Sequence, residues 1–169
     1  MKEYVTLVDE NDNAVGAAEK IDAHRDAKLH RAFSIFIFNS RGELLIQQRA
    51  KGKYHCPGLW ANTCCGHPRP GESLEEAAHR RLWEEMGFDT RMVEAFSFIY
   101  KCEFENGLTE NEYDHVFVGK WDGEPQKNAD EAADYRWVSK DILEKDMKEN
   151  PDIYTVWFKI AWEKLKANS

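Results

Sequence analysis

One amphipathic helix with clear ends constrains the fold of this 169-residue chain more than any other segment. Apolar side chains recur with helical spacing between Ser73 and Met86, and arginines and glutamates occupy the opposite side. Ser73 is a suitable N-cap, Glu76 stands three residues later as a capping box requires, and Gly87 is a suitable stop. Strand-prone runs lie on both sides of this helix, so the pattern predicts a fold that combines helices with a sheet.

The remaining elements are expected in the order strands, central helix, strands and terminal helices. Strands are predicted at 5–8, 32–38, 44–48, 95–104, 113–121 and 135–138, and amphipathic helices at 140–149 and 154–166. The turn at 40–42 should join its two flanking strands into a hairpin, whereas residues 51–70 contain too many glycines and prolines for a regular element. This order predicts an α+β fold, a mixed α/β sandwich, in one domain that spans residues 1–169.

Composition and charge exclude several classes of function. The longest apolar stretch, at 32–38, is far below the ~20 residues of a membrane helix, and the chain starts without a signal-peptide pattern. The four cysteines have no disulfide spacing, so reduced thiols and a soluble, cytoplasmic protein are expected. A net charge of −8 argues against nucleic-acid binding, but a small anion could still bind where cations gather.

The loop and helix at residues 66–87 carry carboxylates and arginines at fixed spacing. Glu85 and Arg81 stand four residues apart, so one helix face offers both a metal ligand and a cation. An ordinary solvated face with Glu–Arg ion pairs is the simpler interpretation of such a helix. However, the segment resembles the Nudix box, in which a loop, a helix and a loop present carboxylates to a divalent cation that carries a diphosphate. The resemblance rests on Gly66, Glu72, Arg80, Glu84, Glu85 and Gly87.

The Nudix resemblance carries expectations about fold and metal. It implies a Nudix fold, with a central mixed β-sheet flanked by helices, and Mg²⁺ bound with the diphosphate at Glu85. One position departs from Nudix hydrolases, which carry a glutamate where this chain has Arg81. The missing carboxylate weakens the case for a diphosphate hydrolase and adds a cation where the diphosphate would lie.

Two further segments resemble those of type 1 isopentenyl-diphosphate isomerases. They are residues 60–68, Trp-Ala-Asn-Thr-Cys-Cys-Gly-His-Pro, and residues 109–112, Thr-Glu-Asn-Glu. The match continues in the same order over nearly the whole chain and includes residues 29–34. The resemblance implies interconversion of isopentenyl and dimethylallyl diphosphate in isoprenoid biosynthesis, with Cys65 and Glu112 as catalytic residues.

This reaction needs an acid and a base on opposite sides of the substrate. A proton is added at one end of an allylic unit and another is removed from C2, through a state that resembles a carbocation. A thiol or thiolate at Cys65 and a carboxyl at Glu112, beside an apolar pocket, meet that need, and which of them adds the proton is left open. The Trp157 ring face could stabilise positive charge, and Tyr100 could hydrogen-bond to Glu112. Core packing of Trp157 and an inert buried thiol at Cys65 are the simpler alternatives.

The same resemblance implies two sets of binding residues. A Mn²⁺ or Zn²⁺ ion is expected on His24, His30, His67, Glu110 and Glu112, a mixture of imidazole and carboxylate that suits either metal. Alternate residues of a strand point the same way, so the two glutamates can converge on one ion. The diphosphate is expected on Lys20, Arg49, Lys53 and Arg81. Structural roles are assigned to His55, His79 and His115.

Two rival functions are left open by the sequence. A Nudix hydrolase would have no use for Cys65 or for the His/Glu site. A non-catalytic module would bind a prenyl diphosphate or a nucleotide without exchanging substrate protons. The expected partner is a small prenyl diphosphate, without nucleic acid or membrane, and the expected assembly is a monomer or weak homodimer.

Overall fold

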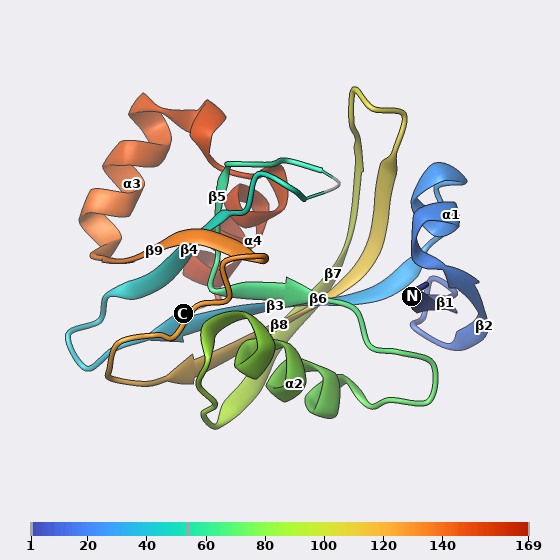
Figure 1. The fold of residues 1–169 in the computed structure, drawn as a ribbon, viewed down its shortest axis with the longest axis horizontal. Helices are drawn as coiled ribbons and strands as arrows, with labels where there is room; N and C mark the ends of the chain where they lie inside the picture. Colours follow the sequence, from blue (N-terminus) through green and yellow to red (C-terminus); the bar gives the residue numbers. More distant parts are fainter. Residues whose placement is uncertain (1, 54, 169) are drawn as a thin grey trace.

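The computed structural model describes residues 2–53 and 55–168, in which one mixed sheet is flanked by helices (Figure 1). The strands are β1 (Tyr4–Val8), β2 (Ala14–Glu19), β3 (His30–Phe38), β4 (Leu44–Arg49), β5 (Trp60–Ala61), β6 (Cys64–Gly66), β7 (Met92–Glu103), β8 (Thr109–Lys120) and β9 (Ala132–Val138). The helices are α1 (Lys20–Arg25), α2 (Leu74–Met86), α3 (Lys140–Glu149) and α4 (Val156–Ala167), with a 3₁₀ turn η1 at Pro151–Ile153. The expected α+β fold with a central mixed sheet is confirmed.

Strand β3 is the centre of the sheet. Strand β8 runs parallel to it along its full length, from the pair His30 and Glu112 to the pair Phe38 and Lys120. On its other edge, β3 pairs antiparallel with β1, β6 and β4. The parallel register brings the start of β3 beside the start of β8. Polar side chains that are far apart in the sequence therefore meet at one end of the sheet.

Apolar side chains of β3 point alternately to the two faces of the sheet, and helices cover both faces. On one face, Phe33 and Ile35 pack in a buried cluster with Leu82 of α2. On the other face, Phe36 stacks on Trp162 of α4, with ring centroids 6.5 Å apart. Figure 1 shows α2 on one side of the sheet and α3 and α4 on the other. The packing of β3 on both faces thus fixes α2 in place against the sheet.

Helix α2 is built as its sequence predicts. Ser73 Oγ accepts a hydrogen bond from Glu76 N, and the Glu76 carboxylate accepts one from Ser73 N, each at 3.1 Å. Gly87 ends the helix in the left-handed conformation, with φ of 72°, and a Cβ there would lie 2.5 Å from Gln126 O. The capping box and the terminal glycine are local signals, which is why both ends could be predicted.

The pairing of the strands differs from the sequence prediction. Strands β3 and β4 share one paired position, Phe38 with Leu44, so the predicted hairpin is limited to its turn. Beyond this position, β4 pairs with β5 and β9 in place of β3. Residues 51–70 were predicted to be irregular, and this is wrong because they contain the short strands β5 and β6, each held by a longer neighbour.

Other boundaries and local features follow the prediction more closely. Helix α3 spans the predicted residues 140–149, whereas α4 begins at Val156, two residues later than predicted. The sequence prediction omits β2, which is largely exposed and rich in alanine, and α1, which has six residues. All four cysteines are free, as expected. Within the described ranges, no helix has the length and apolar character needed to cross a membrane.

Candidate active site

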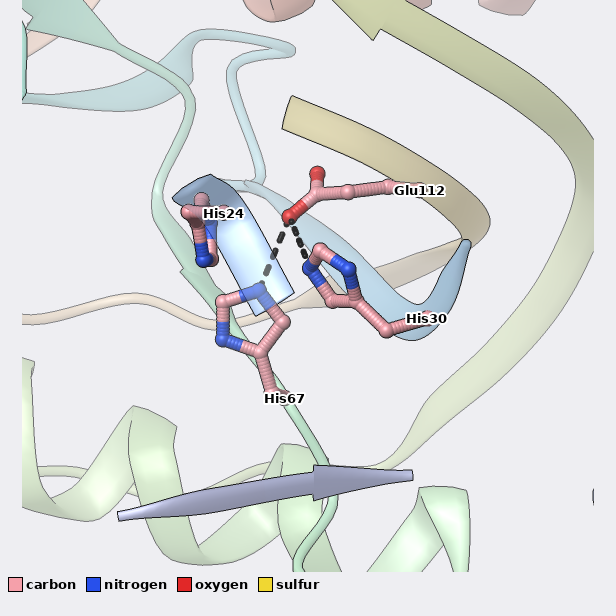
Figure 2. A group of neighbouring side chains, drawn as sticks. All are labelled: His24, His30, His67 and Glu112. Atoms are coloured by element: carbon pink, nitrogen blue, oxygen red, sulfur yellow. Dashed lines mark hydrogen bonds and ion pairs between the residues drawn. The ribbon is translucent and has the colours of Figure 1, made fainter. Parts of the chain in front are cut away.

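Three histidines and one glutamate meet where β3 and β8 begin (Figure 2). One ligand atom from each of His24, His30, His67 and Glu112 lies within 4.8 Å of the other three. Glu112 Oε2 lies 2.8 Å from His67 Nε2 and 3.4 Å from His30 Nε2, the contacts drawn as dashed lines in Figure 2. The four side chains come from α1, β3, the loop after β6, and β8. Four of the five metal ligands predicted from the sequence therefore lie together.

Backbone carbonyls orient two of these imidazoles. His24 Nδ1 donates a hydrogen bond to Lys20 O at 2.7 Å, and His30 Nδ1 donates to Lys28 O at 2.9 Å. Because a carbonyl can only accept, both Nδ1 atoms carry protons, which leaves Nε2 as the atom of each ring that can coordinate a cation. Nε2 is also the His30 atom that faces Glu112. Oriented imidazole lone pairs beside a carboxylate fit a divalent transition metal or zinc.

Burial and hydrogen bonding favour the charge states that such a metal requires. Burial lowers the pKa of His24 and brings the pKa of His67 to about 3, although Glu112 opposes the latter shift. Burial alone would raise the pKa of Glu112, but its contacts with the imidazoles of His30 and His67 hold it well below its usual value. The site thus favours the neutral forms of His24 and His67 beside an ionised Glu112, and these are the forms that bind cations.

Glu110, the fifth predicted ligand, lies outside this group of four. Its Oε1 is 2.7 Å from His55 Nε2, so its nearest imidazole is one that the sequence analysis assigned a structural role. The His55 ring lies 5.2 Å from that of Trp157 and 6.1 Å from that of His24, measured between centroids. Burial, aided by Arg49, lowers the pKa of His55 to about 2. His55 is therefore a site residue that the sequence analysis missed, because nothing in the irregular-looking segment around it indicates where it points.

Cys65 is held by a polar network on one face of the sheet. Asn62 Nδ2 donates to Cys65 Sγ at 3.2 Å, and Ser34 Oγ lies 3.7 Å from the same sulfur. Ser34 Oγ donates to Asp114 Oδ2 at 2.8 Å, so its oxygen is left to accept the thiol proton. Burial, reinforced by Asp114, raises the pKa of Cys65 to about 12, which keeps the thiol protonated. By contrast, Cys64 points to the opposite face and packs in the core beneath α2.

One cavity connects Cys65 with Glu112. Both residues line it together with Trp157, which is almost fully buried and also belongs to the core cluster around α4. The core packing of Trp157 is therefore confirmed, and its stabilisation of positive charge stays a prediction. The Arg49 guanidinium carbon lies 5.1 Å from the centre of the Trp157 ring. Tyr100 pairs with Glu112 across β7 and β8, but its buried hydroxyl makes no hydrogen bond to Glu112 among the described atoms. The hydrogen bond predicted for Tyr100 is therefore wrong, because cross-strand pairing aligns the backbones without bringing the two polar ends together.

The predicted anion-binding residues converge on the same cavity. Lys20, Arg49, Lys53 and Arg81 all line it, together with Arg69 and Arg80. They come from α1, β4, the following loop and α2, so their proximity depends on the tertiary fold. This cluster of cations explains how a chain with a net charge of −8 can present a local site for an anion.

Carboxylates of α2 and of a distant loop lie against these cations. Glu85 Oε1 accepts from Arg81 Nη2 at 2.8 Å, and Glu85 Oε2 accepts from Gln47 Nε2 at 3.0 Å. The two hydrogen bonds named here leave lone pairs on the Glu85 carboxylate for a cation, which fits the expected Mg²⁺ ligand. Glu131, which the sequence analysis did not single out, forms ion pairs with both Arg81 and Lys53.

Comparison with known proteins identifies close relatives and structural neighbours. Residues 28–158 match the family described as NUDIX domain. Isopentenyl-diphosphate Delta-isomerase 2 of Photorhabdus laumondii is 56% identical over 159 residues, covering 94% of this chain and 90% of the relative. Isopentenyl-diphosphate Delta-isomerase 2 of Aromatoleum aromaticum is 50% identical over 165 residues, covering 98% and 87% respectively.

Solved structures show the same fold at lower sequence identity. A Deinococcus radiodurans protein superposes with a TM-score of 0.74 at 25% identity, covering 88% of this chain and 90% of that protein. A MutT protein from Methanosarcina mazei superposes with a TM-score of 0.67 at 23% identity, covering 82% and 94% respectively. The sheet and helices described above are thus those of the Nudix fold.

Proposed function

This chain belongs to the NUDIX family and, within it, to the isopentenyl-diphosphate Delta-isomerases, and we propose that it interconverts isopentenyl and dimethylallyl diphosphate. The observation that carries the proposal is the placement of Cys65 and Glu112 on one cavity. Cys65 lies on β6 and Glu112 on β8, and these strands flank opposite edges of β3. Two proton-handling groups therefore reach the cavity from different sides, as an allylic proton shift requires.

Each of the two groups can exchange a proton with the substrate. The Cys65 thiol is protonated and partly buried, and it can give up its proton while Asn62 and Ser34 hold the sulfur in place. Glu112 is anchored by His30 and His67, which fixes the direction of its carboxylate. One group adds a proton to the terminal carbon and the other removes a proton from C2, and the division between them stays open.

The surroundings suit a positively charged state. Trp157 lines the cavity with these two groups, and its ring can stabilise the developing charge. Its burial, together with the packing of α4, keeps water away from a cation that water would trap. The proposal therefore gives Trp157 a catalytic as well as a structural role.

Two metal sites complete the proposal. Mg²⁺ would bind the diphosphate at Glu85, assisted by Lys20, Arg49, Lys53 and Arg81, and it would neutralise part of the charge of the diphosphate. A Mn²⁺ or Zn²⁺ ion would bind His24, His30, His67 and Glu112, with Glu110 as a fifth ligand if its carboxylate turns from His55. The enzyme is accordingly proposed to be metal-dependent. Its location in the cytoplasm and its organisation as one domain stay predictions from the sequence.

Proton NMR of isopentenyl diphosphate in D₂O tests this function directly. With purified protein, Mg²⁺ and Mn²⁺, we expect deuterated dimethylallyl diphosphate, and we expect its loss in Cys65→Ser and in Glu112→Gln. Cys64→Ser is the matched control, because Cys64 faces the core beneath α2 and should leave the exchange intact. Release of phosphate without proton exchange would contradict the isomerase and indicate a hydrolase. Binding of the substrate without either reaction would indicate a non-catalytic module.

A further inference from the structure

Glu131 is a carboxylate placed between two cations of the diphosphate site. Its Oε2 contacts both Lys53 Nζ and Arg81 Nη2, the latter at 3.1 Å. All three side chains line the cavity, and each is about one-fifth exposed: 18% for Lys53, 18% for Arg81 and 23% for Glu131. An anion that binds this cation pair must therefore bind beside a fixed negative charge.

Backbone hydrogen bonds hold Glu131 at this position. Its carbonyl accepts from Ala50 N at 3.1 Å, which ties it to the end of β4, and its N–H donates to Asn128 O at 3.0 Å. Asn128 N in turn donates to Glu85 O at 2.8 Å, so the same loop is fastened to α2. Burial would raise the pKa of Glu131, but the ion pairs with Lys53 and Arg81 lower it, so the carboxylate is ionised at neutral pH.

The local balance of charge disfavours a bare diphosphate. Arg81 contacts Glu84 and Glu85 as well as Glu131, so three carboxylates surround the two cations. A free diphosphate carries about three negative charges, whereas its complex with a divalent cation carries about one. Repulsion from a fixed carboxylate grows in proportion to the charge of the ligand, so Glu131 opposes the free anion about three times as strongly as the metal complex.

We propose that Glu131 makes this cation pair select a diphosphate as its divalent-metal complex and discriminate against the free anion. The inference rests on the proposed function, because it assumes that the cavity binds a diphosphate. It assigns Glu131 to selectivity and not to proton transfer. Replacement by the isosteric glutamine should keep the shape of the site while it removes the charge.

The expected effect can be stated as a ratio of dissociation constants. For partly exposed groups about 6 Å apart, one unit of ligand charge changes the affinity about fivefold. Glu131→Gln should then tighten metal-free pyrophosphate about 100-fold and the magnesium complex about fivefold. The dissociation constant of pyrophosphate without Mg²⁺, divided by its dissociation constant with Mg²⁺, should therefore fall about 20-fold.

Isothermal titration calorimetry with inorganic pyrophosphate measures this ratio without turnover. The full chain is titrated in EDTA and in excess Mg²⁺, for the wild type, Glu131→Gln and Glu131→Asp. Glu149→Gln on α3 is the matched control, because it removes one negative charge from an exposed position. Glu131→Asp keeps the charge and should keep most of the magnesium dependence. It therefore distinguishes the effect of the lost charge from an effect of the substitution on the stability of the protein.

The outcomes distinguish this inference from the proposed function. A ratio that falls in Glu131→Gln because metal-free pyrophosphate binds more tightly, and that does not fall in Glu149→Gln, supports the role of Glu131. An unchanged ratio overturns it. Weaker binding with Mg²⁺ alone also overturns it, by making Glu131 a metal ligand, and so does weaker binding both with and without Mg²⁺, by making Glu131 a clamp for the cations. If the wild type exchanges protons of isopentenyl diphosphate, only the inference about Glu131 fails. If it neither exchanges protons nor binds magnesium pyrophosphate, both fail.

Discussion

The attachment of α2 to the sheet can be tested by truncating Leu82, which is fully buried on this helix and adjacent in sequence to Arg81. Leu82 packs in the cluster that contains Phe33 and Ile35 of β3, so Leu82→Ala removes apolar contact and leaves a cavity in a closely packed layer. Large-to-small changes at such positions cost about 2–5 kcal/mol, and we expect about 3 kcal/mol here. With a urea m-value of about 2 kcal/mol/M, the unfolding midpoint should fall by about 1.5 M.

The control for this experiment lies on the same helix. Trp83 is adjacent to Leu82 but 63% exposed, so Trp83→Ala should change the free energy of unfolding by no more than about 0.5 kcal/mol. Equilibrium urea unfolding, followed by circular dichroism, measures both variants with the same m-value. Equal losses in the two variants would refute the claim that one apolar stripe holds α2, and with it the explanation of how Arg81 and Glu85 are positioned.

Three further predictions concern the site. Cys65→Ser should lower kcat for the isomerisation by at least about 100-fold, the scale of general acid–base catalysis, whereas Cys64→Ser should retain it, as NMR exchange assays would show. Saturating Mn²⁺ or Zn²⁺ at about 100 times Kd should raise Tm by about 5–10 °C, and a rise that persists in His67→Ala but not in His79→Ala would contradict the metal site. Hydrogen bonds from its arginine partner on α2 lower the pKa of Glu72, so their stabilisation is present above pH 4.5 and lost as the pH falls through the lowered pKa. Glu72→Gln should therefore cost about 1 kcal/mol in urea unfolding at pH 7 and less as the pH falls below 4.5 through the lowered pKa, and a cost that does not change with pH would contradict the assignment.

Local signals determined which elements could be predicted from the sequence. The ends of α2 depend on Ser73, Glu76 and Gly87, which act within one or two turns of the helix, so the sequence specifies them without the rest of the fold. The partners of β3 depend on contacts with β8, about eighty residues away, and no local pattern reveals that register. The predicted hairpin was therefore restricted to its turn, although both of its strands exist.

The same distinction applies to the site. His24, His30, His67 and Glu112 were named through the family resemblance, and the fold brings them together. His55, Ser34, Asp114 and Glu131 were missed because their significance comes from neighbours in space. Such residues orient the groups that the sequence motifs reveal, and they emerge only when the strands and loops are assembled. A motif thus identifies candidate chemistry, while the fold identifies what positions it.

The structure also suggests how a Nudix fold could be adapted from hydrolysis to proton transfer. Helix α2 carries Glu85, the proposed ligand of a divalent cation, but Arg81 stands at a position that resembles a carboxylate site of the hydrolases, and it pairs with Glu85 and Glu131. The two groups proposed to handle protons lie instead on β6 and β8, on either side of β3. Under the proposed function, the helix therefore serves to bind the diphosphate, and the reaction takes place at the sheet. A change at Arg81 should then affect KM more than a change at Cys65, because the two residues act on different parts of one substrate.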